Sequence, residues 1–331
     1  MAWMNYRPRL LAALFGCLLV GALLGPVCGQ SAYPTKPVNI LISFSPGGVV
    51  DISTRALTAK AEKILGQPFV LSNNGGGGGA VAAAVVSTQK PDGYNLLSCT
   101  STTLIRIPQY RTVPYSLDDF VPIMQHASTE SGLAVRVDSP FKSLKDLVDY
   151  ARKNPGKVTY STLGIGSPMH LSMEFIAKQE GITWTHVPYP GSMPSVTALL
   201  GGHVTATSAS TEWKPFVLDG TLRLLATHGL KRMQTFPNVP TMKELGYDFY
   251  NDTTFVIMAP KGTPMPLVKK LEDVLHKAFN DPEYHAVLAR IDHVPAFRNS
   301  EDTMKFLKHA YEVNGKWIAE LRIPKESDQK K

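Results

Sequence analysis

The chain repeats one local pattern: an apolar run, a glycine-rich turn, and then apolar side chains at helical spacing. Its first copy is the run 38–44, the turn 45–48 and a stretch that ends at Gly66. A second copy places five consecutive glycines, residues 75–79, between the run 69–71 and a helix-forming segment. This alternation predicts an α/β fold in which parallel strands are joined by right-handed crossovers.

A second series of the same kind occupies residues 133–227. The apolar run 255–258 then returns the chain to the first sheet, because the amphipathic stretch 267–278 needs a sheet to cover. The chain therefore crosses twice between two units. Two crossing strands make a hinge, and ligands of α/β proteins bind in clefts of this kind.

Chain length supports the same division, since a single core rarely serves more than about 250–300 residues. We predict a first domain of residues 33–126 and 253–331 and a second domain of residues 127–252. The predicted fold class is α/β, with two domains and two crossing strands as the hinge between them.

Residues 1–29 are typical of a signal peptide. Arg7 and Arg9 give a positive start, and the uncharged apolar run 10–24 ends near Pro26. A membrane anchor is the competing interpretation, but the run is short for a span of about 20 residues. The sequence therefore predicts export to the periplasm.

Two of the three cysteines, Cys17 and Cys28, lie within the predicted signal peptide. Lipid attachment at Cys28 is an alternative that Val27, directly before it, disfavours. If cleavage follows Gly29, Cys99 is the one cysteine that remains, so no internal disulfide can form.

The charge of the chain restricts its partners only mildly. The formal net charge is +7, and +5 without Arg7 and Arg9. No cluster of basic residues alternates with aromatic residues, so nucleic acid is not expected as a partner.

The turn after the first apolar run is a candidate anion site. Ser45, Pro46, Gly47 and Gly48 lead from a strand into a helix, whose unpaired N–H groups and positive end would face the cleft. Asp51 follows in the first helical turn, where we interpret it as a capping or bracing residue rather than a catalytic acid.

A similar turn occurs in the second series. Gly164 and Gly166 precede Ser167, a predicted N-cap, and Pro168 at the first helical position. His170 follows, and two interpretations stay open: contact with a ligand, or a ring satisfied by nearby backbone.

The sequence lacks complete motifs of the enzyme classes considered. Residues 75–80 formally satisfy a dinucleotide fingerprint, but no acidic residue ends a second strand at the expected distance. Ser167 has Met169 where a nucleophile elbow needs glycine, and no histidines stand at metal-binding spacing. We expect no catalysis, no cofactor and no metal.

Short motifs spread along the chain resemble those of the tripartite tricarboxylate transporter substrate-binding proteins, the Bug receptors of Bordetella and related bacteria. The resemblance spans essentially the whole mature chain. The motifs are Tyr33-Pro34-Thr35-Lys36-Pro37-Val38, Pro46-Gly47-Gly48 with Asp51, Leu65-Gly66-Gln67-Pro68, Pro91-Asp92-Gly93-Tyr94, residues 115–120, His186-Val187-Pro188-Tyr189, residues 199–202 and Pro237-Asn238-Val239-Pro240-Thr241.

The resemblance implies a two-domain periplasmic binding protein of the Venus-flytrap, type II-like kind. It also implies that the glycine loop of the first domain binds one ligand carboxylate while loops of the second domain hold the distal part. It implies as partners a small carboxylate and the large and small membrane permease subunits, with a sensor protein as the alternative to the permease. A monomer suits a receptor whose domains close about a hinge. The ligand-binding residues that it implies are Phe44, Ser45, Pro46, Gly47, Gly48, Asp51, Asn73, Ser101 and Thr102 in the first domain, and Gly164, Ser167, His170 and Ser208 in the second.

Three departures from the family pattern bear on the ligand. Val49 and Val50 replace smaller or more polar residues, and Asn74-Gly75 replaces Arg-Pro. Residues 204–210 contain none of the aspartates that the family usually has there, so an ammonium group lacks a partner. We predict a mono- or dicarboxylate without an amine, with aromatic acids among the candidates; a ligand-dependent sensor and an exported nucleotide-binding enzyme are the alternatives.

Overall fold

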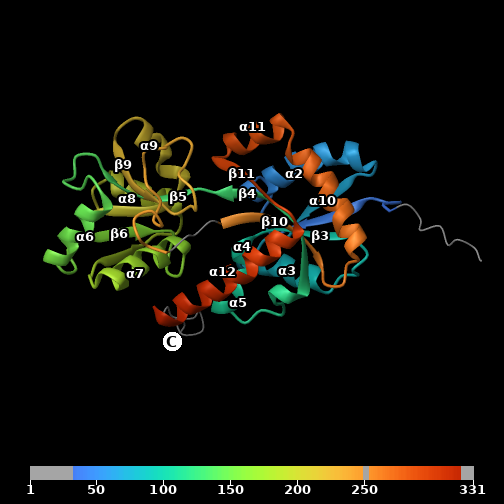
Figure 1. Cartoon of the computed structure of the whole chain (residues 1–331), viewed down its shortest axis with the longest axis horizontal. Helices are drawn as coiled ribbons and strands as arrows, with labels where there is room; N and C mark the ends of the chain where they lie inside the picture. The colour runs from blue at the N-terminus through green and yellow to red at the C-terminus, as the bar shows by residue number, and fades with distance from the viewer. Residues whose placement is uncertain (1–32, 249–252, 322–331) are drawn as a thin grey trace, which may run out of the picture.

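The computed structural model describes residues 33–248 and 253–321, so the predicted signal peptide lies outside the described residues. Two β-sheets, each with helices on both faces, form two domains that lie side by side along the long axis of the molecule (Figure 1). Each domain has its own pair of hydrophobic clusters, one on each face of its sheet.

The first sheet has the strand order β11-β4-β10-β3-β1-β2. Strands β1, β2 and β3 are parallel, as the sequence pattern predicts, whereas β10 is antiparallel to both β3 and β4. The sheet is therefore mixed, because the returning chain inserts β10 between two earlier strands. The strands are β1 Val38–Ile42, β2 Phe69–Asn73, β3 Asn95–Thr100, β4 Phe120–Thr129, β10 Thr253–Pro260 and β11 His293–Arg298.

Helices cover both faces of this sheet. One core packs side chains such as Leu57 and Leu271 against Ile40, and the other packs Leu104 and Leu307 against Leu97. The helices of the first face are α2 Val49–Leu65, α10 Met265–Phe279 and α11 Pro282–Arg290; those of the second are α3 Ala80–Ser87, α4 Ser101–Ile105, α5 Ile107–Tyr110 and α12 Ser300–Glu320.

The second sheet has the order β7-β6-β8-β5-β9. Strands β6, β7 and β8 are parallel, and β5 is antiparallel to β8 and β9. The strands are β5 Ser131–Arg136, β6 Thr159–Thr162, β7 Thr185–Pro188, β8 Ala206–Ser210 and β9 Leu222–Thr227, and the helices are α6 Leu144–Lys153, α7 Pro168–Glu180, α8 Ser192–Leu200 and α9 Lys214–Leu218.

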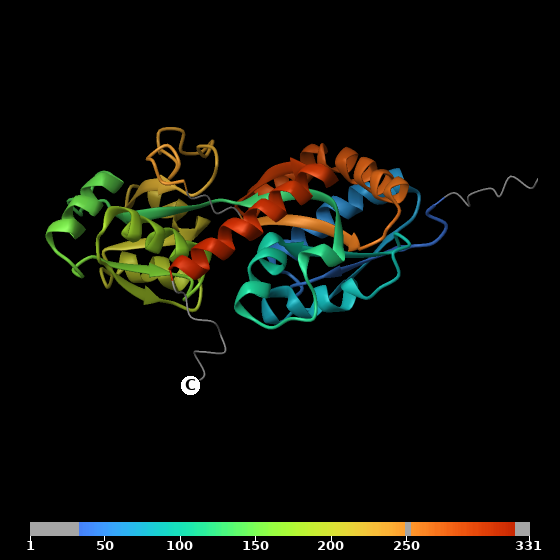
Figure 2. The ribbon, with the colours of Figure 1, turned by 60° about the horizontal axis from the view of Figure 1, so that its bottom comes forward.

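Three segments connect the domains. Strand β4 continues into β5 through Glu130, and the second passage, residues 249–252, lies outside the described residues. Helix α12 begins on the first sheet and reaches α7 of the second domain (Figure 2). There Ile318 packs against Leu171, and the rings of Trp317 and Phe175 lie 5.4 Å apart.

Candidate ligand-binding site

A cavity of about 630 Å³ lies where the two domains meet. The carboxyl ends of the parallel strands β1 and β3 reach it from one side, and that of β8 from the other. Its lining residues are Phe44, Ser45, Gly48, Val49, Val50, Thr100, Thr129, Ser210, Thr211, Glu212, Thr253, Phe255, Ile291, Asp292 and His293.

The first-domain wall is the start of helix α2. Gly48 is the N-cap and brings no capping side chain, so the N–H groups of the first turn have no acceptor within the helix. Gly47 before it has a φ of 77°, a conformation that glycine adopts without strain. The positive end of α2 therefore faces the cavity, beside the exposed side chain of Val49.

Asp51 does not line the cavity. It stabilises the loop before α2 by hydrogen bonds. Its carboxylate accepts hydrogen bonds from the Gly47 N–H, the Arg55 Nε and the Asn73 amide, at 2.9, 2.8 and 2.9 Å. Burial alone would raise the pKa of Asp51, but these hydrogen bonds lower it below its ordinary value. The structure thus agrees with the interpretation of Asp51 as a bracing residue.

The other first-domain candidates divide in the same way. Asn73 donates to the Phe44 carbonyl at 3.0 Å, which fixes the loop that Phe44 begins. The hydroxyl of Ser101 accepts the Thr254 N–H at 3.1 Å and is buried, so Thr100 lines the cavity instead. Pro46, Gly47 and Thr102 are likewise absent from the cavity lining.

In the second domain, the turn before α7 has the predicted cap. Ser167 is the N-cap and accepts the His170 N–H at 3.2 Å, with Pro168 in the first turn. The Nδ1 of His170 accepts the Gly166 N–H at 3.1 Å, so the ring is turned back onto its own loop. Two interpretations of His170 were open, and the structure shows the second: the ring forms a hydrogen bond with nearby backbone.

A second histidine supports the ring of His170. The rings of His170 and His186 stack with centroids 4.1 Å apart, and the Nε2 of His186 lies 2.7 Å from the Thr162 hydroxyl. Burial lowers the pKa of both histidines to about 4, and the neighbouring His186 adds to the effect on His170. Both rings are therefore neutral at pH 7 and hold the turn that contains Gly164. In this arrangement Gly164, Ser167 and His170 do not line the cavity.

Ser208 lies inside the second domain and not in the cavity. Strand β8 pairs on both sides, so only its carboxyl end reaches the cavity. The Ser208 hydroxyl is buried, 3.4 Å from both the Ser172 hydroxyl and the Nε2 of His228. Ser210, Thr211 and Glu212, which follow it, line the cavity.

Glu212 lines the cavity, although no sequence motif marks it as a site residue. Its carboxylate accepts a hydrogen bond from the Ser192 hydroxyl, whose oxygen accepts the Ser210 N–H at 3.1 Å. Ser192 begins α8, so the start of this helix fixes the position of the carboxylate. The signal in the sequence was its place directly after a strand whose parallel neighbour ends at the same edge.

The floor of the cavity belongs to the strands that join the domains. Thr129 of β4 donates to the Nε2 of His293 at 3.0 Å, because the Nδ1 of that ring faces the Ile291 carbonyl and must carry the proton. Asp292 forms an ion pair of 3.2 Å with Lys214 of the second domain. This ion pair connects the domains at the edge of the cavity.

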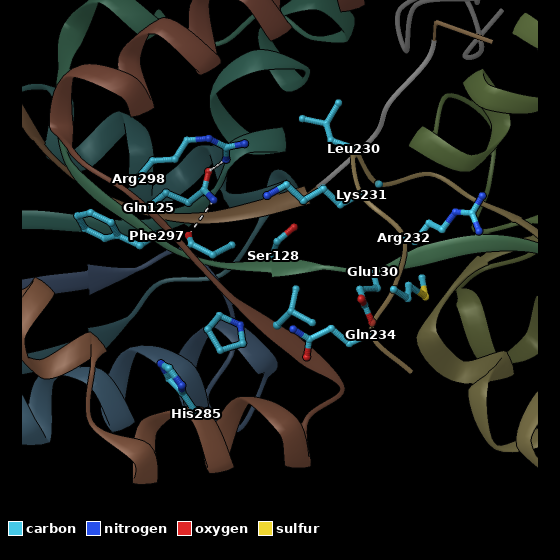
Figure 3. A pocket seen from close by; sticks show the side chains of 15 residues that line it. Gln125, Ser128, Glu130, Leu230, Lys231, Arg232, Gln234, His285, Phe297 and Arg298 are labelled. Carbon is cyan, nitrogen blue, oxygen red and sulfur yellow. Dashed lines mark hydrogen bonds between the residues drawn. The ribbon is translucent and has the colours of Figure 1, made fainter. Parts of the chain in front are cut away.

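A second cavity of about 630 Å³ lies on the other side of β4 (Figure 3). Ser128 and Glu130 line it, whereas Thr129 between them lines the first cavity. Arg298 donates to Gln125 at its inner end. None of the predicted site residues lines this cavity. Volume does not distinguish the two, so the positive end of α2 identifies the first as the candidate site.

Two further observations concern the described residues alone. Within 33–248 and 253–321, no group of three or more His, Cys, Asp or Glu side chains is placed to hold a metal ion. No helix in the same ranges has the length and apolar character to cross a membrane.

Two α/β domains with crossing strands and a cavity at the facing ends of their sheets define the class of two-domain solute-binding proteins. Residues 53–323 match the family described as tripartite tricarboxylate transporter family receptor. The chain belongs to this family, whose members are periplasmic receptors.

Individual proteins agree with the family match. A Cupriavidus necator protein described as "UPF0065 protein in gbd 5'region" is 38% identical over 88% of this chain and 90% of its own. BugT of Bordetella pertussis is 31% identical over 90% of this chain and 93% of its own.

Solved structures show the same fold. A ligand-free solute-binding protein from Polaromonas superposes with a TM-score of 0.82 at 26% identity, over 87% of this chain and 99% of its own. An R. palustris protein solved with adipate superposes with a TM-score of 0.68 at 29% identity, over 88% and 99%.

Proposed function

We propose that the protein is an extracytoplasmic receptor that binds a small carboxylate between its domains and performs no chemistry on it. The observation that carries this proposal is the uncapped N-terminus of α2 in the wall of the cavity. Each helix terminus stabilises an anion by about 0.3–2 kcal/mol, and each charge-assisted hydrogen bond adds about 1.5–3 kcal/mol. Several such contacts reach the roughly 8 kcal/mol of micromolar binding.

The residues divide into two roles in this proposal. Phe44, Ser45 and Gly48 contact the ligand, since they line the cavity, and Asp51 and Asn73 position their loop. The turn with Gly164, Ser167 and His170 approaches the ligand only when the domains close.

Closure of the domains about β4 and β5 completes the site. A ligand that contacts both domains stabilises the closed form, whereas a ligand that touches one domain does not. The superpositions support such a movement. The chain fits the ligand-free Polaromonas structure with a TM-score of 0.82 and the adipate-bound one with 0.68, although the second is more similar in sequence.

The adipate in the R. palustris structure supports carboxylates as the ligand class, and the family supports delivery to a membrane permease. Export through a cleaved segment 1–29 would bring the receptor to the periplasm. Residues 204–210 contain no aspartate, but Glu212 supplies a carboxylate just beyond them that could partner an amine of the ligand.

A thermal-shift screen of the mature protein, refolded to remove carried-over ligand, tests the proposal. The compounds are mono-, di- and tricarboxylates, aromatic acids, amino acids and nicotinamide nucleotides. A ligand at about 100 times its Kd adds about 2.7 kcal/mol to the free energy of unfolding, a shift of several degrees. We expect a selective response to one group of carboxylates. A response to nucleotides alone would contradict the receptor proposal.

A further inference from the structure

The charged side chains of the cavity are unevenly placed. Glu212 and Asp292 are the two acidic residues in its lining. Asp292 is neutralised by Lys214 at 3.2 Å. Glu212 has no lysine or arginine nitrogen of the described residues within 4.0 Å, and its hydrogen-bond partner there is the Ser192 hydroxyl. The second-domain end of the cavity therefore presents a negative charge.

Ser192 orients the carboxylate of Glu212 but occupies only part of its hydrogen-bonding capacity. An ionised carboxylate can accept about four hydrogen bonds, and Ser192 donates one. Ser192 is held in turn by the Ser210 N–H, and it is buried at the start of α8. Glu212 thus keeps a fixed position with acceptor capacity left for a ligand.

The opposite end of the cavity has the opposite preference. The N-terminus of α2 at Gly48 and Val49 favours an anion, because the helix dipole and the unpaired N–H groups act there. A ligand that reaches both ends meets a positive helix end and a negative side chain. The second carboxylate of a linear dicarboxylate would lie against Glu212, where like charges repel more strongly than in bulk water.

We propose that the ligand carries a hydrogen-bond donor, a hydroxyl or an ammonium group, at the end remote from its carboxylate, and that Glu212 selects for this donor. The inference rests on the proposed carboxylate receptor and departs from the sequence-based prediction of a ligand without an amine. It makes Glu212 a specificity-determining residue of the site.

Calorimetry with chain-matched ligands tests the selection. Each set has four members of one length, for example hexanoate, adipate, 6-hydroxyhexanoate and 6-aminohexanoate, and shorter sets of four and five carbons are run alongside. We expect the hydroxy acid or the amino acid of one length to bind at least tenfold more tightly than the matching dicarboxylate. The two donors distinguish ion pairing from hydrogen bonding. If the amino acid binds most tightly, Glu212 forms an ion pair with the ligand; if the hydroxy acid does, a hydrogen bond alone accounts for the preference.

Three variants assign the preference to Glu212. Glu212→Gln removes the charge and is expected to reduce the ratio of affinities at least tenfold, whereas Glu212→Asp keeps the charge and retains the preference. Glu301→Gln is the matched control, because Glu301 is exposed on α12 and pairs with Lys305. Melting curves establish that each variant is folded.

The outcomes separate this inference from the proposed function. A wild-type preference for the dicarboxylate that Glu212→Gln leaves unchanged would overturn the inference, while carboxylate binding itself would stand. The absence of binding by every carboxylate, hexanoate included, would contradict the receptor proposal and the inference with it.

Discussion

The carboxylate of Asp51 accepts a hydrogen bond of 2.9 Å from the backbone N–H of Gly47, the residue directly before the N-cap of helix α2. Asp51→Ala leaves this N–H without its acceptor and removes one of the two acceptors of the Asn73 amide, which keeps the Phe44 carbonyl. Hydrogen bonds to a charged group contribute about 1.5–3 kcal/mol each, but water replaces part of the loss because Gly47 is exposed, so we expect the free energy of unfolding in urea to fall by about 1–3 kcal/mol.

A matched acid provides the control for Asp51. Asp273 is exposed on α10 and forms a surface ion pair with Lys269. Asp273→Ala should change the free energy of unfolding by less than about 1 kcal/mol, as exposed pairs do. Equal effects of the two substitutions would show that Asp51 does not brace the loop.

The histidine pair predicts a loss of stability in acid. The pKa of His170 is lowered to about 4 in the folded protein from an ordinary value of 6.5. As the pH falls, the unfolded chain binds this proton first, so the free energy of unfolding decreases between pH 6.5 and about 4 and the contribution of His170 levels off below. Each unit of separation between the two pKa values corresponds to about 1.4 kcal/mol.

His170→Asn isolates this contribution. The side-chain oxygen of asparagine can accept the Gly166 N–H as Nδ1 does, but it does not titrate. Urea unfolding measured from pH 7 to pH 4 should therefore show a smaller decrease for the variant, by about 1–3 kcal/mol. An identical pH dependence in both proteins would contradict the assignment.

The contact between α12 and α7 predicts that a substitution in α12 lowers the stability of the protein by weakening the packing between the two domains. Ile318 is 7% exposed and packs on the fully buried Leu171. Ile318→Ala should lower the free energy of unfolding by about 2 kcal/mol, the lower end for buried aliphatic truncations, because the cluster is small. Tyr311→Ala on the same helix is the control, since Tyr311 is exposed. If the two variants have the same stability, α12 does not hold the second domain through this contact.

Helices and their ends were predictable where a single segment contains the pattern that determines them, such as helical spacing or a capping residue. The helical spacing that ends at Gly66 gave α2, and the Ser-Pro sequence at residue 167 gave the cap of α7. Strand β8 was not recognised, because its sequence, Ala206–Ser210, is small and polar and has little apolar pattern. The insertion of β10 between β3 and β4 depends on contacts between distant segments, which local patterns do not report.

The site was predictable in part for the same reason. The turn with Ser45 and Gly48 follows directly from a strand that runs into a helix, and both residues line the cavity. Ser208 lies outside the cavity lining, and the sequence could not show this, since the depth of a residue along a strand paired on both sides depends on the whole sheet. Glu212 could not be found from the sequence, because only the fold brings it into the same cavity as the N-terminus of α2.

In the proposed receptor the N-terminus of α2 holds the carboxylate of the ligand, and a substitution of Val49 tests this directly. Val49 is the first residue of α2, lines the cavity and is 40% exposed. Val49→Asp puts a negative charge at this point, and a carboxylate in the first helical turn stabilises a helix by about 0.3–1 kcal/mol, so the fold should persist. Val49→Asn has the same shape without the charge.

Isothermal titration calorimetry of the two variants with the carboxylate from the thermal-shift screen is the most direct measurement. Two like charges about 4 Å apart repel by about 1–4 kcal/mol at a protein surface. We therefore predict that Val49→Asp weakens binding at least tenfold relative to Val49→Asn, with no loss in Tm. Equal affinities of the two variants would contradict the claim that the ligand carboxylate binds at the start of α2.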